Sequence, residues 1–339
     1  MELKFEILKF TKTLFSEVLN DENSNKFPGY DAISAANPWF TEDNVKFMFQ
    51  YWVDELNSKN VENWLNAYNF KSKNNKPKLA IIFAGNIPMV GMHDLLCGLV
   101  CNCDLKLKLS SKDKILPKWY ISQLKNKFPE LENSIEIIDH IIKDFDAVIA
   151  TGSNNSGRYF NYYFEKYPHI IRKNRNSVAL ITGNENIDEL EAIAEDIFIY
   201  FGLGCRSISM LLAPENYDFT SLIEIFIQKY DYLINHHKYA NNYEYYRALF
   251  LMNMSEFKDC GFFILRESDS LAAPMSVVNY KYYKDLNEAE SFLSMNIDEL
   301  QTIVSHQNET KYILPGTAQK PKLNDYSDGI DTINFLLNL

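Results

Sequence analysis

A chain of 339 residues can bury a substantial core and normally divides into about two domains. Its net charge of -11 argues against a nucleic-acid backbone as the main partner, because such binding usually requires a clustered basic surface. Hydrophobic residues make up 46% of the chain, yet no apolar run approaches the roughly 18 residues needed to cross a bilayer, so we expect no membrane span.

The N-terminus and the cysteines predict a cytoplasmic protein with reduced thiols. The opening sequence, MELKFEILKF, interleaves charged and apolar side chains and lacks the apolar centre of a secretory signal. The five cysteines are unevenly spaced, which does not suit a disulfide framework. His93, Cys97 and Cys101 share one helical face, but the paired spacing of a zinc site is missing, so we predict a packed core face and no metal site.

The N-terminal region, 1–77, has the apolar periodicity of helices. One predicted helical face comprises Phe47, Tyr51, Trp52 and Leu56. The region ends in the polar run KSKNNKPK, residues 71–78, which predicts a loop or linker. We therefore expect a helical N-terminal region over 1–77.

Between residues 78 and 183, short apolar runs alternate with helical stretches. The predicted strands lie in LAIIFAG, DLKLKLS, SIEIIDH, DAVIATGS and SVALIT, with a helix near 113–127. This alternation is typical of βαβ units, which build a mainly parallel sheet with helices on both faces. It predicts the α/β fold class.

A second α/β region is expected over 184–310. It opens with the helix IDELEAIAEDIFIYF, which Gly202 and Gly204 stop, and it continues with the predicted strands ISMLLAP, FFILRES and SVVNYKY. The last residues, 311–339, contain several prolines and glycines and predict an extended C-terminal arm.

Cys205 is the candidate nucleophile. It stands in FGLGCRS, between the glycine-stopped helix and a buried strand, with Arg206 beside it. Small residues let a substrate carbonyl approach the sulfur. A neighbouring cation or oriented N–H groups would lower the thiol pKa from about 8.5 and favour the reactive thiolate. The alternative is a buried structural cysteine.

Asn86 is the candidate oxyanion donor. It stands in AGNIP, residues 84–88, where a strand ends and a helix is expected to begin with Pro88 in its first turn. Ligands of open α/β sheets bind at this carboxyl edge, so an amide there can hold a developing negative charge. The alternative is an asparagine that supports the turn.

Two further strand ends are candidate cofactor contacts. DLKLKLS ends in Ser110, Ser111 and Lys112, where an enzyme that prefers NAD tends to place an acid, so hydroxyls and a cation there favour the extra phosphate of NADP. ATGSNNSG, residues 150–157, is a glycine-rich turn that can receive a phosphate at a helix N-terminus, although it is not a P-loop. The alternatives are the solvated face of a strand and an ordinary strand-to-helix turn.

Taken in chain order, these motifs resemble the framework of the aldehyde dehydrogenase superfamily. The GN-x-P sequence, the KLS strand end and the glycine-rich approach to the cysteine are most similar to the acyl-CoA reductases typified by the fatty-acid reductase of bacterial luminescence. The similarity covers about residues 78–339. It implies a Rossmann-like, parallel-sheet dinucleotide-binding domain over 78–183 and an α/β catalytic cysteine domain over 184–310.

The resemblance also implies roles for individual residues. Cys205 resembles the acyl-accepting nucleophile, and Asn86 resembles the oxyanion donor. For the cofactor, the resemblance assigns Lys108 and Ser111 to the adenosine ribose, and Gly152 and Ser153 to the turn beneath the pyrophosphate.

Two positions depart from the superfamily pattern. Ser270 takes the place of the acid that usually contacts the nicotinamide ribose, so Glu267 or Asp269 would have to substitute. Arg172 falls near the place of the glutamate that activates hydrolytic water. An enzyme that exchanges its acyl group with a thiol does not need that base, so the second departure favours acyl-CoA reduction.

The residues and the resemblance together predict an NADPH-dependent reductase. It takes an acyl group from a thioester, such as a fatty acyl-CoA, onto Cys205 and releases an aldehyde. Three alternatives stay open: a CoA-acylating aldehyde dehydrogenase in the oxidative direction, a cysteine acyltransferase or thioesterase without redox cofactor, and a catalytically silent scaffold. The predicted partners are the acyl-CoA or another acyl thioester, with an acyl-transferring protein or a homo-oligomer left open.

Overall fold

The computed structural model describes residues 2–70, 76–152, 154–307 and 309–339. The chain divides into two compact units: the first unit comprises 1–174 with 322–339, and the second unit comprises 175–321. Residues 71–75 of the predicted loop and the candidate cofactor residue Ser153 lie outside the described residues.

The first unit opens with helices. These are α1 (Glu2–Asn20), α2 (Tyr30–Ala36), α3 (Glu42–Glu55) and α4 (Ser58–Asn66). Thr41 and Asn57 cap α3 and α4 by accepting hydrogen bonds from backbone N–H groups of the first turn. The buried face of α3 contains Val45, Met48, Phe49 and Trp52, whereas Phe47 and Tyr51 are half-buried. The face is rotated from the expected one because α1 packs on Phe49 through Phe15.

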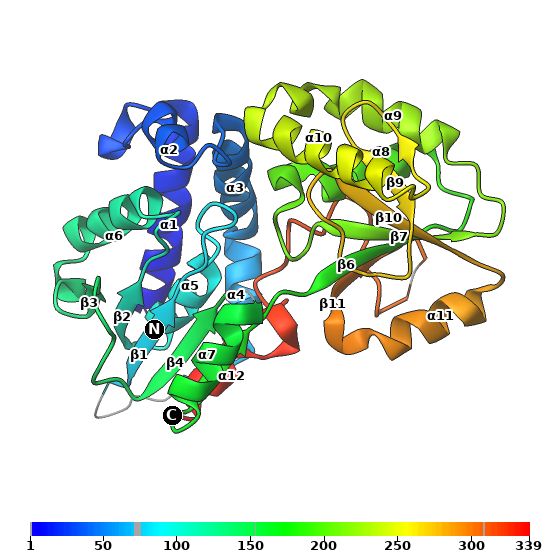
Figure 1. The fold of residues 1–339 in the computed structure, drawn as a ribbon. Coiled ribbons are helices and arrows are strands. Elements are labelled where there is room, and N and C mark those ends of the chain that lie inside the picture. The colour runs from blue at the N-terminus through cyan, green and yellow to red at the C-terminus, as the bar shows by residue number, and fades with distance from the viewer. Residues whose placement is uncertain (1, 71–75, 153, 308) are drawn as a thin grey trace. The chain divides into compact units, whose positions relative to one another are not determined.

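A parallel sheet lies at the centre of the first unit (Figure 1). Its strands are β1 (Lys78–Ile82), β2 (Asp104–Lys108), β3 (Ile135–Ile137), β4 (Ala147–Thr151) and β5 (His169–Arg172), in the order β3-β2-β1-β4-β5. Ile82 pairs with Lys108 on β2 and with Ala150 on β4, so these strands end at one edge. The strand order reverses between β1 and β4, which is where open α/β sheets bind ligands.

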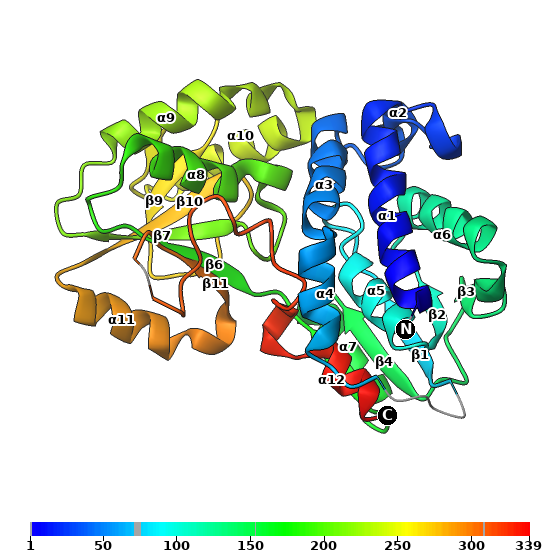
Figure 2. The same ribbon diagram turned by 180° about the vertical axis from the view of Figure 1, so that it is seen from behind.

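Helices cover both faces of this sheet. They include α5 (Met92–Val100), α6 (Ile115–Lys127) and α7 (Asn154–Phe164). A Cβ at Gly98 of α5 would lie 3.2 Å from Leu79, while Phe160 of α7 packs on the cluster that contains Ala80. Neighbouring residues of a strand point to opposite faces, so α5 and α7 lie on opposite sides, as Figures 1 and 2 show.

The segment expected as an extended arm over 311–339 is divided between the units: 311–321 belong to the second unit and 322–339 to the first unit. Helix α12 (Thr332–Leu337) buries Ile333 and Leu336. Trp64 Nε1 donates to the Tyr326 hydroxyl at 2.7 Å, across a sequence separation of 262 residues. The prolines and glycines of this segment gave no sign of that contact, because its partner belongs to α4.

The second unit contains another mainly parallel sheet. Its strands are β6 (Asn176–Leu180), β7 (Ile208–Pro214), β8 (Lys258–Asp259), β9 (Ile264–Glu267), β10 (Val277–Tyr283) and β11 (Leu300–Val304), in the order β11-β6-β7-β10-β9-β8, with β8 antiparallel to β9. Its helices are α8 (Ile187–Phe198), α9 (Thr220–Tyr230), α10 (His237–Met252) and α11 (Leu286–Met295). Parallel strands that alternate with helices in both units confirm the predicted α/β class.

Strand β6 lies in a different sheet from the one expected. Its sequence, SVALIT, continues the predicted series over 78–183, but β6 pairs with β7 and β11 of the second unit. An apolar strand carries no local signal for its sheet, so strands that come later in the chain decide the pairing. None of the described helices has the length and hydropathy needed to span a bilayer.

Candidate active site

Cys205 lies in a tight turn of the second unit, between the 3-10 helix η3 (Ile199–Gly202) and β7. The Ser207 N–H donates to the Gly204 carbonyl at 3.0 Å and closes the turn around Cys205 and Arg206. Cys205 is half-buried, and Arg206 is buried. The fold therefore places the candidate nucleophile at the amino end of a central strand.

The segment that enters this turn has an unusual backbone. Tyr200, Phe201 and Gly202 have φ angles of 56°, 57° and 73°, in the left-handed region that residues with side chains disfavour. Tyr200 and Phe201 are buried, and the Phe201 ring lies 4.6 Å from the His236 ring. Packing thus holds a strained, kinked conformation between α8 and the cysteine turn.

Hydroxyl groups from two strands fix the cysteine turn. Ser177 Oγ on β6 donates to the Cys205 carbonyl at 3.0 Å, and Thr302 Oγ1 on β11 donates to Ser177 Oγ at 2.7 Å. In a planar trans peptide the N–H and C=O groups point in opposite directions. Because the Gly204 carbonyl accepts from Ser207 inside the turn, the Cys205 N–H points to the outer side. The Gly204–Cys205 peptide therefore fixes the direction of the Cys205 N–H relative to the turn.

Asn86 lies at the carboxyl edge of the first sheet, in the loop between β1 and α5. A Cβ at the preceding residue, Gly85, would lie 2.5 Å from Ser110 Oγ and 2.8 Å from Ser110 Cβ. Glycine is required there because the loop runs directly over the end of β2. The close approach brings the Asn86 loop against the Ser110 end of β2.

Asp113 holds the far end of the Asn86 loop. Its carboxylate accepts a hydrogen bond from the Met89 N–H at 2.7 Å, and Met89 has a positive φ of 48°. Burial raises the pKa of Asp113 to about 7. Pro88 lies in a turn before α5, which begins at Met92 and not at Pro88 as expected, because the bonded Met89 turn intervenes.

The cofactor candidates of the first unit follow neighbouring strands. Lys108 Nζ donates to the carbonyls of Asp139 at 2.5 Å and His140 at 2.8 Å, so its ammonium binds the loop after β3. Ser111 is exposed beyond the end of β2. A Cβ at Gly152, just after β4, would lie 2.9 Å from Phe160 Cε2, so the turn passes close to α7. The sheet thus gathers Asn86, Lys108 and Gly152 at one edge, while Cys205 belongs to the second unit.

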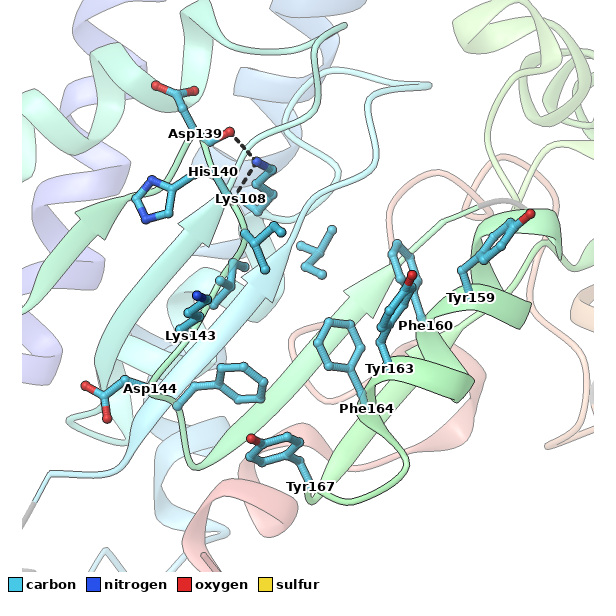
Figure 3. Close-up of a pocket in the computed structure, with 14 residues that line it drawn as sticks. Lys108, Asp139, His140, Lys143, Asp144, Tyr159, Phe160, Tyr163, Phe164 and Tyr167 are labelled. Atoms are coloured by element: carbon cyan, nitrogen blue, oxygen red, sulfur yellow. Dashed lines mark hydrogen bonds between the residues drawn. The ribbon is translucent and has the colours of Figure 1, made fainter.

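A cavity of about 780 Å³ adjoins Lys108 in the first unit. Its floor includes Ile82 of β1, one wall is the loop over residues 139–145, and the other wall is α7. Figure 3 shows Phe160, Tyr163 and Phe164 of α7 facing the strands across this space. The volume lies in the range of small-molecule sites, and the aromatic walls suit a flat ring system.

No group of three or more His, Cys, Asp or Glu side chains among the described residues could hold a metal ion. His93 Nε2 instead contacts the Leu323 carbonyl at 2.9 Å, and Cys97 is buried on the same helix. This side of α5 packs against the C-terminal segment.

A protein-family comparison identifies the chain. The family model described as Acyl-CoA reductase (LuxC) matches residues 26–225, more than half of the chain. The chain belongs to this family. A search of curated proteins found no match.

Solved aldehyde dehydrogenases have the same fold as this acyl-CoA reductase family member. Aldehyde dehydrogenase 21 from Physcomitrella patens, in complex with the reaction product succinate, has a TM-score of 0.67 at 11% identity over 99% of this chain and 83% of that chain. Aldehyde dehydrogenase C from Pseudomonas syringae, a mutant in complex with NAD+ and octanal, has a TM-score of 0.66 at 11% identity over 91% of this chain and 73% of that chain. The aldehyde dehydrogenase-like fold is confirmed, and the protein is an oxidoreductase that acts at the aldehyde or acyl level.

Neighbouring residues of the first unit bind Arg172. Its guanidinium lies 2.7 Å from the Asp94 carboxylate and 2.9 Å from the Thr332 hydroxyl, and all three residues belong to the first unit. Both partners of the ion pair are buried. The position where the resemblance puts a water-activating glutamate therefore carries a buried cation bound to its own neighbours.

Ser270 is also bound within its own unit. Asn279 Nδ2 donates to the Ser270 carbonyl at 2.9 Å, and Ser270 Oγ donates to the Ala272 carbonyl at 3.0 Å. Asp269 forms an ion pair with Lys281, whereas Glu267 is exposed at the end of β9. Of the two acids, Glu267 is the one without an ion pair among the described residues.

Sequence reasoning missed the residues that hold the two candidate site loops. Ser177, Thr302 and Asp113 are buried polar residues, and their bonds reach Cys205 or Met89. The signal for Ser177 and Thr302 is a hydroxyl inside an apolar strand, which burial makes costly unless it is bonded. That signal indicates that the hydroxyl has a hydrogen-bond partner, but it does not identify the partner residue.

Proposed function

We propose that the protein is an NADPH-dependent reductase of acyl-CoA, with a fatty acyl-CoA as substrate and the aldehyde as product. The observation that carries the proposal is the Cys205 turn, which combines a half-buried thiol, a neighbouring arginine and an outward backbone N–H. This arrangement suits nucleophilic acyl transfer, in which a thiolate attacks a carbonyl and donors stabilise the oxyanion.

In the proposed reaction, Cys205 thiolate attacks the thioester carbonyl and forms a new carbon–sulfur bond. The Cys205 N–H and the Asn86 amide stabilise the resulting oxyanion. When the oxyanion collapses, the bond to coenzyme A breaks, its thiolate leaves with the electron pair, and the acyl group stays on Cys205. When bound, NADPH supplies the hydride that reduces this acyl-cysteine to a thiohemiacetal, which releases the aldehyde and regenerates the thiolate.

Features of the first unit favour dinucleotide binding at the carboxyl edge of its sheet, beside Lys108. The cavity of about 780 Å³ beside Lys108 lies in the size range of small-molecule sites, and its aromatic walls suit the flat ring of an adenosine moiety. We assign Lys108 and Ser111 to the adenosine ribose, with Ser111 leaving room for a 2′-phosphate, and the Gly152–Ser153 turn to the pyrophosphate. Gly152 lies just before the amino end of α7, where backbone N–H groups favour a phosphate.

Arg172 supports acyl transfer to a thiol over hydrolysis. A hydrolytic aldehyde dehydrogenase needs a base near the acyl-cysteine, whereas the Arg172 guanidinium is a cation that Asp94 and Thr332 already bind. An acyl-cysteine without a water-activating base survives until the hydride arrives. The same site can also run in the oxidative direction, which forms acyl-CoA from aldehyde, coenzyme A and the oxidised cofactor.

Labelled acyl-CoA tests the proposal directly. Without NADPH, we expect a hydroxylamine-sensitive acyl group on Cys205, and adding NADPH should release it as aldehyde with loss of NADPH absorbance. Cys101→Ala is the matched control, because Cys101 is also half-buried but belongs to the first unit. Undiminished labelling of Cys205→Ala would refute the nucleophile, and an acyl-cysteine that NADPH does not discharge would indicate an acyltransferase or thioesterase.

A further inference from the structure

Gln319 binds one end of the turn that carries Cys205 and lies close to the other end. Its Nε2 donates to Ser207 Oγ at 3.0 Å, and its Oε1 would lie 3.2 Å from a Cβ on Gly204. The Gln319 side chain is buried, so both contacts lie away from bulk water. Gly204 and Ser207 are also the two residues whose backbone hydrogen bond closes the turn.

Helix α8 fixes the segment that carries Gln319. The Asp196 carboxylate accepts hydrogen bonds from the Gly316 N–H at 2.7 Å and the Ala318 N–H at 3.0 Å. Asp196 is 1% exposed, so these bonds clamp the chain just before Gln319. Lys320, just after Gln319, forms an ion pair with Glu195 of the same helix at 2.5 Å. The Gln319 backbone is thus held on both sides.

We propose that Gln319 is a positioning residue that orients the Cys205 turn, so that the Cys205 N–H faces the oxyanion formed during acyl transfer. The direction of this N–H follows from the Gly204 carbonyl, because the two groups share one planar peptide. The hydrogen bond from Gln319 to Ser207 stabilises the backbone hydrogen bond between Gly204 and Ser207, which sets this direction. The proposal rests on the proposed function, and it adds a residue that touches neither substrate nor cofactor.

Two reactions of the Cys205 thiol distinguish a residue that orients the Cys205 N–H from a residue that only keeps the turn folded. Acylation by acyl-CoA builds negative charge on a carbonyl oxygen, so it depends on oriented donors. Alkylation by iodoacetamide displaces iodide from a saturated carbon, so it depends on the thiolate and its exposure and needs no oxyanion donor. A residue that orients the N–H affects the first rate, whereas a residue that merely keeps the turn folded affects both.

Gln319→Ala is the test, with Gln228→Ala on the exposed side of α9 as the matched control. We expect the acylation rate constant of Gln319→Ala at saturating acyl-CoA to fall about tenfold to a hundredfold, as for other small losses of alignment at a reacting centre. Its alkylation rate should stay close to that of the wild type, whereas the lost buried hydrogen bond should lower its urea midpoint modestly. Equal loss of both rates, or no loss of acylation, would overturn the proposal.

Ser207→Ala removes the same hydrogen bond from the other side and leaves a smaller gap. It should show the same selective loss of acylation, and Gln319→Ala should add little in that background. Additive losses would overturn the proposal even if one variant folds poorly. A wild-type protein that iodoacetamide alkylates at Cys205 and acyl-CoA does not acylate would contradict the proposed function itself. Normal wild-type acylation with unimpaired variants would contradict only the role of Gln319.

Discussion

Replacement of Arg172 by methionine should strongly destabilise the first unit. The Arg172 guanidinium lies 2.7 Å from Asp94, whose side chain is 7% exposed, and it also binds the Thr332 hydroxyl in α12. Methionine fills much of the same space but leaves the Asp94 carboxylate buried without its counter-ion. Breaking a buried pair from one side costs about 3–5 kcal/mol, a large part of the roughly 5–15 kcal/mol that stabilises a typical domain.

Urea unfolding of Arg172→Met, followed by tryptophan fluorescence, measures this cost. The double variant Arg172→Met/Asp94→Leu should recover most of the lost unfolding free energy, because apolar residues of similar volume replace both charges. Arg247→Met is the matched control, since the Arg247–Asp259 pair is partly exposed and water screens its charges, so this replacement should cost much less unfolding free energy. A cost for Arg172→Met no larger than that of Arg247→Met, or a double variant as unstable as Arg172→Met alone, would refute the reasoning.

Three further outcomes can be measured. Gly85→Ala should lower the unfolding free energy by about 1–3 kcal/mol, because the new Cβ would lie 2.5 Å from Ser110 Oγ. Adding Ser110→Gly should restore much of this loss. If calorimetry shows that the effects of the two substitutions on unfolding free energy simply add, the clash is excluded. Ser111→Glu should shift the ratio of NADPH to NADH affinities toward NADH, because a carboxylate repels the 2′-phosphate; an unchanged ratio in cofactor titrations would show that Ser111 does not contact that phosphate. Burial raises the pKa of Asp113 to about 7, so between about pH 4 and 7 the folded state keeps a proton that the unfolded state has lost. The unfolding free energy of the wild type should therefore fall as the pH rises through this window, compared with that of Asp113→Asn. Parallel pH profiles of the two unfolding free energies would contradict that sign.

Local patterns predicted the parts of the fold that depend on nearby residues. Apolar runs located β1, β4 and β7, because a strand buried on both faces needs a short, continuous set of apolar side chains, and the alternation of leucine with lysine located β2. The motifs around Asn86, Lys108 and Cys205 indicated the family, which the comparison confirmed, because each motif is a short stretch at a strand end. The assignments of these residues to individual steps remain predictions.

Contacts between distant segments decided the rest. The partners of β6 come from β7 and β11, and the C-terminal residues join the first unit through Trp64 and Tyr326, 262 residues apart. Arg172 looks from sequence like a replaced catalytic base, but Asp94, 78 residues earlier, makes it one half of a buried ion pair. Desolvation makes a buried polar side chain costly unless it has a hydrogen-bond or ionic partner. The sequence alone therefore shows that a polar residue in an apolar segment needs such a partner. Which residue meets the need depends on how the strands and helices pack, and only the tertiary structure decides it.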